Sequence, residues 1–272
     1  MLKNEHCETV HKSIKIWQKC KGSNFCLSDF TKYHSARARY PPLLTAPVLK
    51  SPAIFLIFAT PQRENRKRRT KHFTMQRIYD KLKTKTVGIA GCGGLGSNCA
   101  AALVRVGIGK LLIADFDIVE KGNLNRQFYF NDQIGKPKVF VLKENLLRIN
   151  PEAEIITFNI KLCSSDIVEI FKDCDVIVEA FDLNRMKQMI IETVLDQMPD
   201  KYIVSGMGLA GWGENNTLTT RRFGNLIICG DYQREVSESF PPLAPRVGVA
   251  ACMQANAVME LLLGNMDDFD NK

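Results

Sequence analysis

The sequence predicts an α/β protein in which helices cover both faces of a doubly wound, mostly parallel sheet. From about residue 85, short apolar segments alternate with helical segments, which is the pattern of parallel strands joined by crossover helices. A glycine-rich turn joins the first strand to the first helix. At 45% hydrophobic and 24% charged residues, the chain has enough apolar side chains for a packed core.

Each element follows from its local pattern. The first strand is expected over 87–90, and Ser97 is expected to cap a small-residue helix over 99–106. The second strand, 110–114, ends at Asp115. The remaining expected elements are helices over 137–149, 166–171 and 184–198, strands over 155–160, 175–180 and 202–205, an antiparallel excursion over 218–229, and a closing helix over 245–263.

The charge distribution divides the chain near residue 75. Residues 1–80 hold 16 Lys and Arg against 5 Asp and Glu, together with all four histidines. Residues 81–272 are left with 21 basic and 24 acidic residues. We therefore expect a basic N-terminal leader over 1–75, either flexible or upstream of the true start, followed by one domain over 76–272 that works without histidine.

Composition excludes several classes of protein. The longest apolar run, 53–59, is far shorter than the roughly 20 residues of a membrane helix, so no membrane partner is expected. The nine cysteines form no C-x-x-C pair and no regular framework, which favours a reducing cytoplasm and argues against a zinc site. The basic run at 66–71 is typical of nucleic-acid patches, but a solvated linker explains it more simply.

The turn after the first strand has the G-x-G-x-x-G spacing of a phosphate-binding loop. Gly91, Gly93 and Gly96 allow a tight turn and close approach of an anion, while free N–H groups at the helix start face that anion. Asp115 lies 19 residues after Gly96 and can accept hydrogen bonds from ribose. The fold is therefore Rossmann-like, and this fingerprint alone favours an NAD(P)-dependent oxidoreductase.

The segment beyond Asp115 indicates a triphosphate instead. It places Asn123, Arg126 and Gln127 shortly after the acid, and G-K-P-K then supplies Lys138. Cations can neutralise phosphate charge, and amides add neutral hydrogen bonds. A catalytically silent nucleotide-binding scaffold stays open as a second alternative.

Taken in series, these motifs resemble the ThiF/MoeB/E1-like adenylyltransferase family. The matching motifs are GCGGLG at 91–96, DFDIV at 115–119, NLNRQ at 123–127, GKPK at 135–138 and APRVG at 244–248. The resemblance covers about residues 81–264 and is nearest to the zinc-free branch that adenylates the sulfur carrier ThiS in thiamine biosynthesis. Molybdopterin-synthase activation and tRNA threonylcarbamoyladenosine dehydration remain possible within the superfamily.

The resemblance implies an activity, two cofactors and a partner. It implies adenylation of the C-terminal Gly-Gly of a ubiquitin-like sulfur carrier protein, with ATP and Mg²⁺, by a homodimer. The implied contacts with ATP and its metal are Gly93 and Gly94 under the phosphates, Asp115 on the ribose, Asn123, Arg126 and Gln127 on the triphosphate, Arg126 on the transition state, Lys138 on the phosphates and Asp182 on Mg²⁺.

The sequence departs from the family pattern at several positions. Asp182 is followed by Leu183 where relatives have Asn, and Cys229 stands alone where many relatives carry zinc cysteines, so no zinc is expected. Cys229 is also the candidate for a covalent intermediate, although a cysteine closing an apolar strand is more often buried. Arg69 or Arg77 could supply the arginine that dimeric relatives donate to the partner's site.

Overall fold

A computed structural model describes residues 75–234 and 236–264 of the chain. Residues 1–74 of the predicted basic leader, among them Arg69, lie outside the described residues. The domain boundary near residue 75 therefore stays a prediction.

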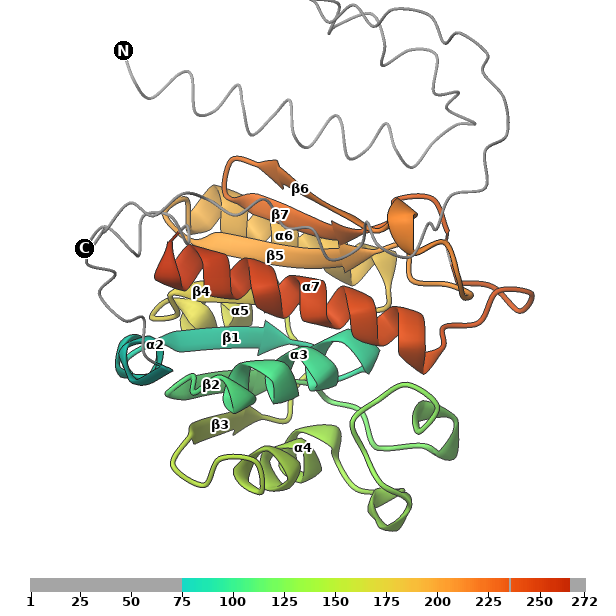
Figure 1. Cartoon of the computed structure of the whole chain (residues 1–272), viewed down its shortest axis with the longest axis horizontal. Helices are drawn as coiled ribbons and strands as arrows, with labels where there is room; N and C mark the ends of the chain where they lie inside the picture. The colour runs from blue at the N-terminus through green and yellow to red at the C-terminus, as the bar shows by residue number, and fades with distance from the viewer. Residues whose placement is uncertain (1–74, 235, 265–272) are drawn as a thin grey trace, which may run out of the picture. The chain divides into compact units, whose positions relative to one another are not determined.

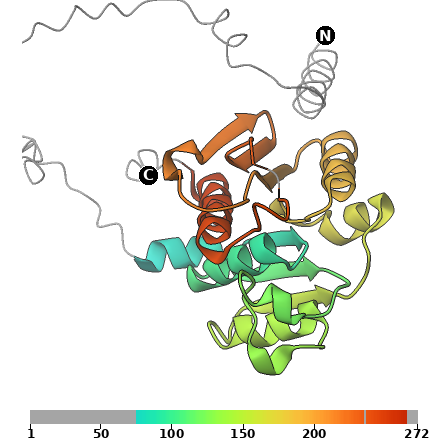
Figure 2. The ribbon, with the colours of Figure 1, turned by 90° about the vertical axis from the view of Figure 1, so that its right-hand side faces the viewer.

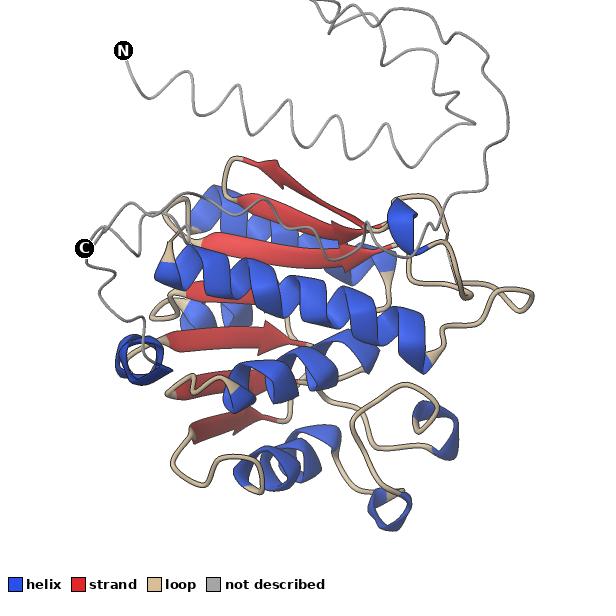
Figure 3. Cartoon of the chain, viewed as in Figure 1, coloured by secondary structure: helices blue, strands red, loops and turns tan. Residues whose placement is uncertain are grey.

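The described residues build a seven-stranded sheet in the order β3-β2-β1-β4-β5-β7-β6. All neighbouring strands are parallel except β6, which pairs antiparallel with β7 at the edge of the sheet (Figures 1 and 3). The strands are β1 Thr86–Ala90, β2 Lys110–Ala114, β3 Glu154–Phe158, β4 Val176–Glu179, β5 Tyr202–Met207, β6 Thr219–Phe223 and β7 Leu226–Gly230. This confirms the predicted Rossmann-like, mostly parallel architecture.

Helices cover both faces of the sheet. α3, α4 and α7 lie on one face, with α3 and α7 packed side by side, while α5 and α6 cover the other (Figure 1). The helices are α2 Met75–Leu82, α3 Gly94–Arg105, α4 Lys138–Leu147, α5 Ser164–Phe171, α6 Asn184–Gln197 and α7 Ala244–Leu263. Short 3₁₀ turns are η3 Lys121–Asn123, η4 Asn131–Gln133 and η5 Asn215–Thr217.

Two apolar cores sandwich the sheet because strand side chains alternate in direction. In β2, Leu111 and Ile113 pack in the core under α3, α4 and α7. Leu112 and Ala114 of the same strand pack in the other core with Phe171 and the helices α5 and α6. Strands buried on both faces read as continuous apolar runs, which is why the sequence pattern revealed them.

The start of α3 differs from the sequence prediction. The helix begins at Gly94, with Gly93 as its N-cap, so Ser97 lies inside the first turn. The Ser97 hydroxyl donates to the carbonyl of Gly93 at 2.6 Å and accepts from the N–H of Phe128 at 3.0 Å. The glycine loop therefore runs directly into the helix, and the buried serine ties it to the segment that follows β2.

Two other parts of the fold add detail to the sequence prediction. The antiparallel excursion consists of β6 and β7, and β7 returns to pair in parallel with β5. The helix α2 precedes β1 and was not predicted.

α7 satisfies the length and composition of a membrane-crossing helix, but half of that stretch is buried against the rest of the domain. Packing against α3 and the sheet explains its apolar sequence.

The sheet order places a topological switch point between β1 and β4. The chain leaves β1 toward β2 and β3 on one side, then crosses to β4 on the other side of β1. Figure 2 looks onto the edge at which these parallel strands end. In open α/β sheets, ligands bind outside the carboxyl ends of the strands at such a switch point.

Candidate nucleotide site at the carboxyl edge of the sheet

The glycine loop lies at this switch point, directly after β1. Gly91 has φ +97°, and a Cβ atom placed on it would lie 2.7 Å from the carbonyl oxygen of Ala180, just after β4. A Cβ on Gly96 would lie 1.8 Å from the carbonyl oxygen of Gly91. Both positions therefore exclude side chains, and the loop is held compactly between β1 and β4.

Gly93 and Gly94 face the segment that follows β2. A Cβ on Gly94 would lie 3.5 Å from Cγ of Arg126, and one on Gly93 would lie 3.8 Å from Nε2 of Gln127. The first-turn N–H groups of α3 have no intrahelical partners, so they can bind an anion. The fold thus brings the predicted phosphate loop together with two of the predicted triphosphate ligands.

Arg126 is anchored through its own backbone. Asn98 of α3 donates from Nδ2 to the carbonyl oxygens of Gly94 and Arg126, at 2.7 and 2.9 Å. The guanidinium donates to the Gly122 carbonyl at 3.0 Å and to Oδ1 of Asn125 at 2.7 Å. These neutral acceptors leave the positive charge unpaired within the described part of the chain, so it is available to a phosphate.

Gln127 has spare hydrogen-bonding capacity at the same place. The residue is buried, and its Oε1 atom has no hydrogen-bond partner among the described residues. A buried polar atom without a partner is costly unless a ligand or water satisfies it. The orphaned amide beside Gly93 therefore fits a bound nucleotide.

Asn123 has a structural role in addition to its predicted contact with the triphosphate. Its Oδ1 accepts the N–H of Glu120 at 3.0 Å and closes the 3₁₀ turn η3. This turn shapes the backbone leading to Arg126.

Asp115 lies at the end of β2, beside the glycine loop. Its two carboxylate oxygens accept the N–H groups of Cys92 at 2.6 Å and Asp117 at 2.8 Å. Burial raises the pKa of Asp115 above its usual value, although these hydrogen bonds oppose the shift. A carboxylate oxygen has more than one acceptor site, so Asp115 can still accept from a ribose hydroxyl.

Lys138, at the start of α4, is paired with Asp117. Its Nζ lies 2.7 Å from Oδ2 of Asp117, and its side chain is only 7% exposed, against 47% for the aspartate. The pair lies close enough to Asp115 and Cys92 to influence the pKa of both. Lys138 is thus beside the nucleotide site, but its charge is already partly compensated.

Asp182 follows β4, on the other side of the switch point from β2. It is exposed and has no partner in the described ranges. Among residues 75–234 and 236–264, no group of three acidic, histidine or cysteine side chains could enclose a metal. A single carboxylate suits Mg²⁺, which commonly takes its other ligands from phosphates and water, so Asp182 fits that ion.

A buried polar network supports the loop that carries Asp182. Glu179 is fully buried and pairs with Lys187, whose Nζ lies 3.0 Å from both carboxylate oxygens. The same carboxylate accepts the N–H of Phe181 at 2.7 Å and the hydroxyl of Ser205 at 2.5 Å. The network fixes the backbone immediately before Asp182.

The location of Cys229 argues against the predicted covalent role. Cys229 lies in β7, is fully buried and belongs to the core beneath α3 and α7. Burial raises the pKa of its thiol, whereas a nucleophilic cysteine needs a lowered pKa and access to substrate. In this position Cys229 is a core residue.

This geometry agrees with the comparison to known proteins. The model of the ThiF family matches residues 65–272. The chain belongs to the ThiF family. Its sequence is 28% identical over 208 residues to a probable molybdopterin-synthase adenylyltransferase of Porphyra purpurea, covering 72% of this chain and 54% of that protein.

Two further relatives extend the range of proteins that the chain resembles. It is 31% identical over 185 residues to the adenylyltransferase and sulfurtransferase UBA4 of Eremothecium gossypii, covering 68% of this chain and 39% of the relative. It is 40% identical over 93 residues to ubiquitin-like modifier-activating enzyme 5 of Caenorhabditis elegans, covering 34% and 22%. The chain thus spans about a fifth to a half of these relatives.

Solved structures show the same fold. The tRNA N6-threonylcarbamoyladenosine dehydratase TcdA of E. coli in complex with ATP matches with a TM-score of 0.59 at 20% identity, covering 68% of this chain and 89% of that chain. E. coli MccB with ATP matches with a TM-score of 0.53 at 24% identity, covering 68% and 58%. At these identities the likeness concerns the fold alone.

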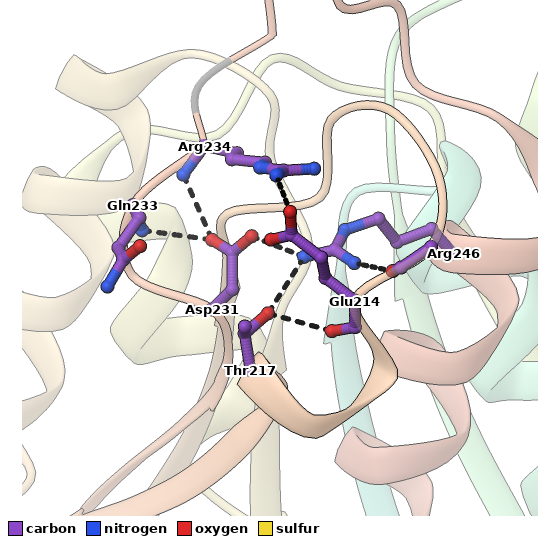
Figure 4. A network of polar contacts seen from close by, with 7 residues as sticks. Glu214, Thr217, Asp231, Gln233, Arg234 and Arg246 are labelled. Atoms are coloured by element: carbon purple, nitrogen blue, oxygen red, sulfur yellow. Dashed lines mark hydrogen bonds and ion pairs between the residues drawn. The ribbon is translucent and has the colours of Figure 1, made fainter.

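Sequence reasoning missed a second polar network in this ThiF-family chain (Figure 4). Arg246, at the start of α7, forms a buried ion pair with Asp231, and both side chains are 2% exposed. Arg246 lies in the A-P-R-V-G motif, and a charged residue in the first turn of a long apolar helix was the available signal. Nothing in the sequence indicated its partner.

Proposed function

We propose that this ThiF-family chain adenylates the C-terminal glycine carboxylate of a ubiquitin-like sulfur carrier protein and releases pyrophosphate. One observation carries the proposal: Arg126 and Gln127 lie against the glycine loop, where the phosphates of ATP would bind. An NAD(P)-dependent oxidoreductase has little use for an unpaired cation at that position. A nucleoside triphosphate needs such a cation, because negative charge develops there during its reaction.

In the proposed reaction, a carboxylate oxygen of the carrier attacks the α-phosphorus of ATP. A phosphorus–oxygen bond forms, the bond from the α-phosphorus to the oxygen that bridges to the β-phosphorus breaks, and pyrophosphate leaves with that electron pair. A C-terminal carboxylate is already ionised near pH 7, so no proton is transferred and no general base is needed. This chemistry suits a domain without histidine in its described residues.

The protein's work is charge neutralisation and alignment of two anions. The start of α3 would hold the phosphates, Asp115 the ribose, and Arg126 the charge that develops in the transition state. Lys138 would add a second cation. Mg²⁺, when bound at Asp182, supplies further neutralisation of phosphate charge.

The specific partner that we propose is a ThiS-like carrier of thiamine biosynthesis. The motif series and the single cysteine at position 229, in place of two C-x-x-C pairs, support this branch. The relatives above are named for other pathways, so carriers of the molybdopterin-synthase type are the main competitors.

A homodimer is part of the proposal. Between residues 116 and 140, several large apolar side chains are 40–53% exposed: Phe116, Ile118, Phe130, Ile134 and Phe140. Exposed apolar side chains near a binding site are typical of a protein interface. Light scattering of the full chain at micromolar concentration would show twice the 30.7 kDa mass of one chain.

Carrier-dependent exchange of radiolabelled pyrophosphate into ATP tests the activity. The full chain is combined with Mg²⁺ and, in turn, with several small ubiquitin-like proteins ending in Gly-Gly. We expect exchange that requires both the carrier and Mg²⁺. Asp182→Ala should abolish it, whereas Asp196→Ala, an exposed aspartate near the end of α6, should not.

The alternative functions predict different outcomes. ATP binding without exchange for any carrier would indicate a catalytically silent scaffold. A cofactor-dependent absorbance change with NAD(P)H would indicate an oxidoreductase. The carrier with the highest kcat/KM identifies the pathway.

A further inference from the structure

Two loops border the candidate nucleotide site. They lie on the side that is not covered by β2, β4 or the segment that carries Arg126. The first follows β5 and spans 208–218, and the second follows β7 and spans 231–243, with residue 235 outside the described residues. The loops touch each other where the N–H of Gly211 donates to the Pro241 carbonyl at 3.0 Å. Nδ2 of Asn125 reaches the Pro242 carbonyl at 3.4 Å, so the loops border the segment that carries Arg126.

The other sides of the glycine loop are already covered. Asp115 and the segment to Gln127 lie on the β2 side, and Ala180 lies on the β4 side. We therefore expect a carboxylate that approaches the α-phosphorus of bound ATP to pass the rim formed by the two loops. The first loop has Trp212, 66% exposed, and the second has Phe240, 50% exposed, so an apolar contact surface lies on this rim.

Arg246 contacts both loops. Its guanidinium pairs with Asp231 at the start of the second loop, donates to the carbonyl of Gly213 at 2.5 Å in the first loop, and donates to the hydroxyl of Thr217 at 3.4 Å (Figure 4). A planar guanidinium can serve several acceptors at fixed angles, which a lysine ammonium cannot reproduce.

Asp231 extends this control to the second loop. Its Oδ1 accepts the N–H groups of Gln233 and Arg234, at 2.9 and 3.0 Å. A Cβ atom on Gly208 would lie 1.9 Å from the same oxygen, so the carboxylate also fixes where the first loop begins. The buried ion pair of Arg246 and Asp231 thus contacts the backbone of both loops.

The first loop depends on such support because its backbone is unusual. Gly211 and Gly213 have φ of +74° and +71°, and Glu214 has φ of 49°. Glycines in this region allow many alternative conformations, so an external hydrogen bond is needed to select one. The bond from Arg246 to the Gly213 carbonyl is placed to do this.

The same turn of α7 also touches the phosphate loop. Cγ1 of Val247 would lie 2.8 Å from a Cβ atom on Gly94. We infer that Arg246 is a positioning residue that holds the two loops so that the C-terminal tail of the carrier is presented to the α-phosphorus of ATP. This inference rests on the adenylation proposed above.

Arg246→Lys tests the inference in the full chain. Lysine keeps the charge next to Asp231 but cannot serve Gly213 and Thr217 at the same time. In the exchange assay we expect the KM for the carrier to rise about 10-fold or more, as for the loss of one charge-assisted hydrogen bond. The KM for ATP should stay within about 2-fold, since none of the predicted ATP ligands is changed.

Arg105→Lys is the matched control because Arg105 is exposed at the end of α3, at the opposite edge of the sheet. Thr217→Val is a second variant that spares the buried ion pair. It should raise the KM for the carrier in the same direction by about 2- to 3-fold, since a neutral acceptor contributes less. If Arg246→Lys does not fold, Thr217→Val still tests whether the contacts of Arg246 position the loops.

Trp212 emission gives a readout of carrier binding at the first loop. A purely structural role of Arg246 would not change this readout. The chain has only two tryptophans, Trp17 and Trp212, so Trp17→Phe leaves a single reporter on the first loop. Adding the carrier that supports exchange should shift Trp212 emission to shorter wavelength. In Arg246→Lys, the midpoint of this titration should rise by the same factor as the KM.

The outcomes separate the two proposals. Absence of carrier-dependent exchange in the wild type would refute the adenylation itself. Normal exchange in the wild type, with an unchanged KM for the carrier in folded Arg246→Lys or Thr217→Val, would refute only the role of Arg246. Equal rises in both KM values would likewise overturn it in favour of a general structural role.

Discussion

Lys138 of α4 and Asp117 after β2 form an ion pair in which the lysine is almost completely buried and the aspartate is half exposed. The pair joins the two ends of the segment that carries Arg126 and Gln127. The segment with Arg126, the cation proposed to face the phosphates, is therefore held in place before any nucleotide binds.

The two partners should respond differently to mutation. Lys138→Met keeps an apolar stem in the buried position and should lower turnover by about 10²-fold, the scale of one preorganised charge partner, with little loss of stability because the exposed Asp117 can be hydrated. Asp117→Asn leaves a buried cation without its anion and should lower the free energy of unfolding by about 1–2 kcal/mol, less than for a fully buried pair. Exchange rates and urea unfolding measure both effects. Lys172→Met, on the opposite helical layer, is the control, and a larger stability loss in Lys138→Met than in Asp117→Asn would contradict the assignment.

Arg126→Ala should separate binding from chemistry. The guanidinium has only neutral partners in the described residues, so its removal should leave ATP affinity within several-fold and reduce turnover by about 10²-fold. Calorimetry gives the ATP affinity and single-turnover kinetics the rate. Arg148→Ala at the end of α4 should change neither. Equal losses of affinity and rate for Arg126→Ala would contradict a role confined to the transition state.

Nucleotide affinity should depend on the ionisation of Asp115. Burial raises its pKa, so protonation begins at a higher pH than for an exposed aspartate, whose pKa is about 3.9. As the pH falls through this raised pKa, the side chain loses acceptor capacity and ATP affinity should fall. Asp115→Asn should bind ATP more weakly at pH 7 but lack this limb of the pH profile. The titration of ATP affects both proteins equally, so it drops out when the wild-type and Asp115→Asn profiles of affinity against pH are compared. Identical profile shapes would refute the assignment of Asp115 to the ribose.

Cys229→Ala should retain carrier-dependent exchange within about 2-fold, because the buried thiol with its raised pKa is not a nucleophile. In the folded wild type, iodoacetamide should modify the exposed Cys163 and Cys252 in preference to Cys229. Mass spectrometry of the alkylated chain tests this. A carrier linked through Cys229 after incubation with ATP would overturn the prediction.

Gly96→Ala and Gly248→Ala compare two helical glycines. A Cβ on Gly96 would lie 1.8 Å from the backbone oxygen of Gly91, so we expect a loss of about 3 kcal/mol or more, or failure to fold. Nothing lies within 4 Å of a Cβ on Gly248 in α7, so alanine there should stabilise the fold by up to about 1 kcal/mol. Urea unfolding measures both changes. Equal stabilities of the two variants would show that the glycine loop is not closely packed.

The sequence by itself determined the order and type of most elements. Apolar runs bounded by turns identified the strands, and the G-x-G-x-x-G spacing located the phosphate loop, because both signals are local. The helix α2 lies at the edge of the basic segment and was missed. The start of α3 was misjudged because the local pattern of a capping serine does not show that a glycine loop enters the helix directly.

Only the tertiary structure decided which side chains meet. The position of β1 between β2 and β4 brings Gly91 to Ala180, and no periodicity in the sequence encodes that neighbourhood. Burial of Cys229 and the pairing of Arg246 with Asp231 depend on residues from separate strands and helices. Such contacts arise from packing over long sequence separations, whereas local patterns report only the environment that each segment will require.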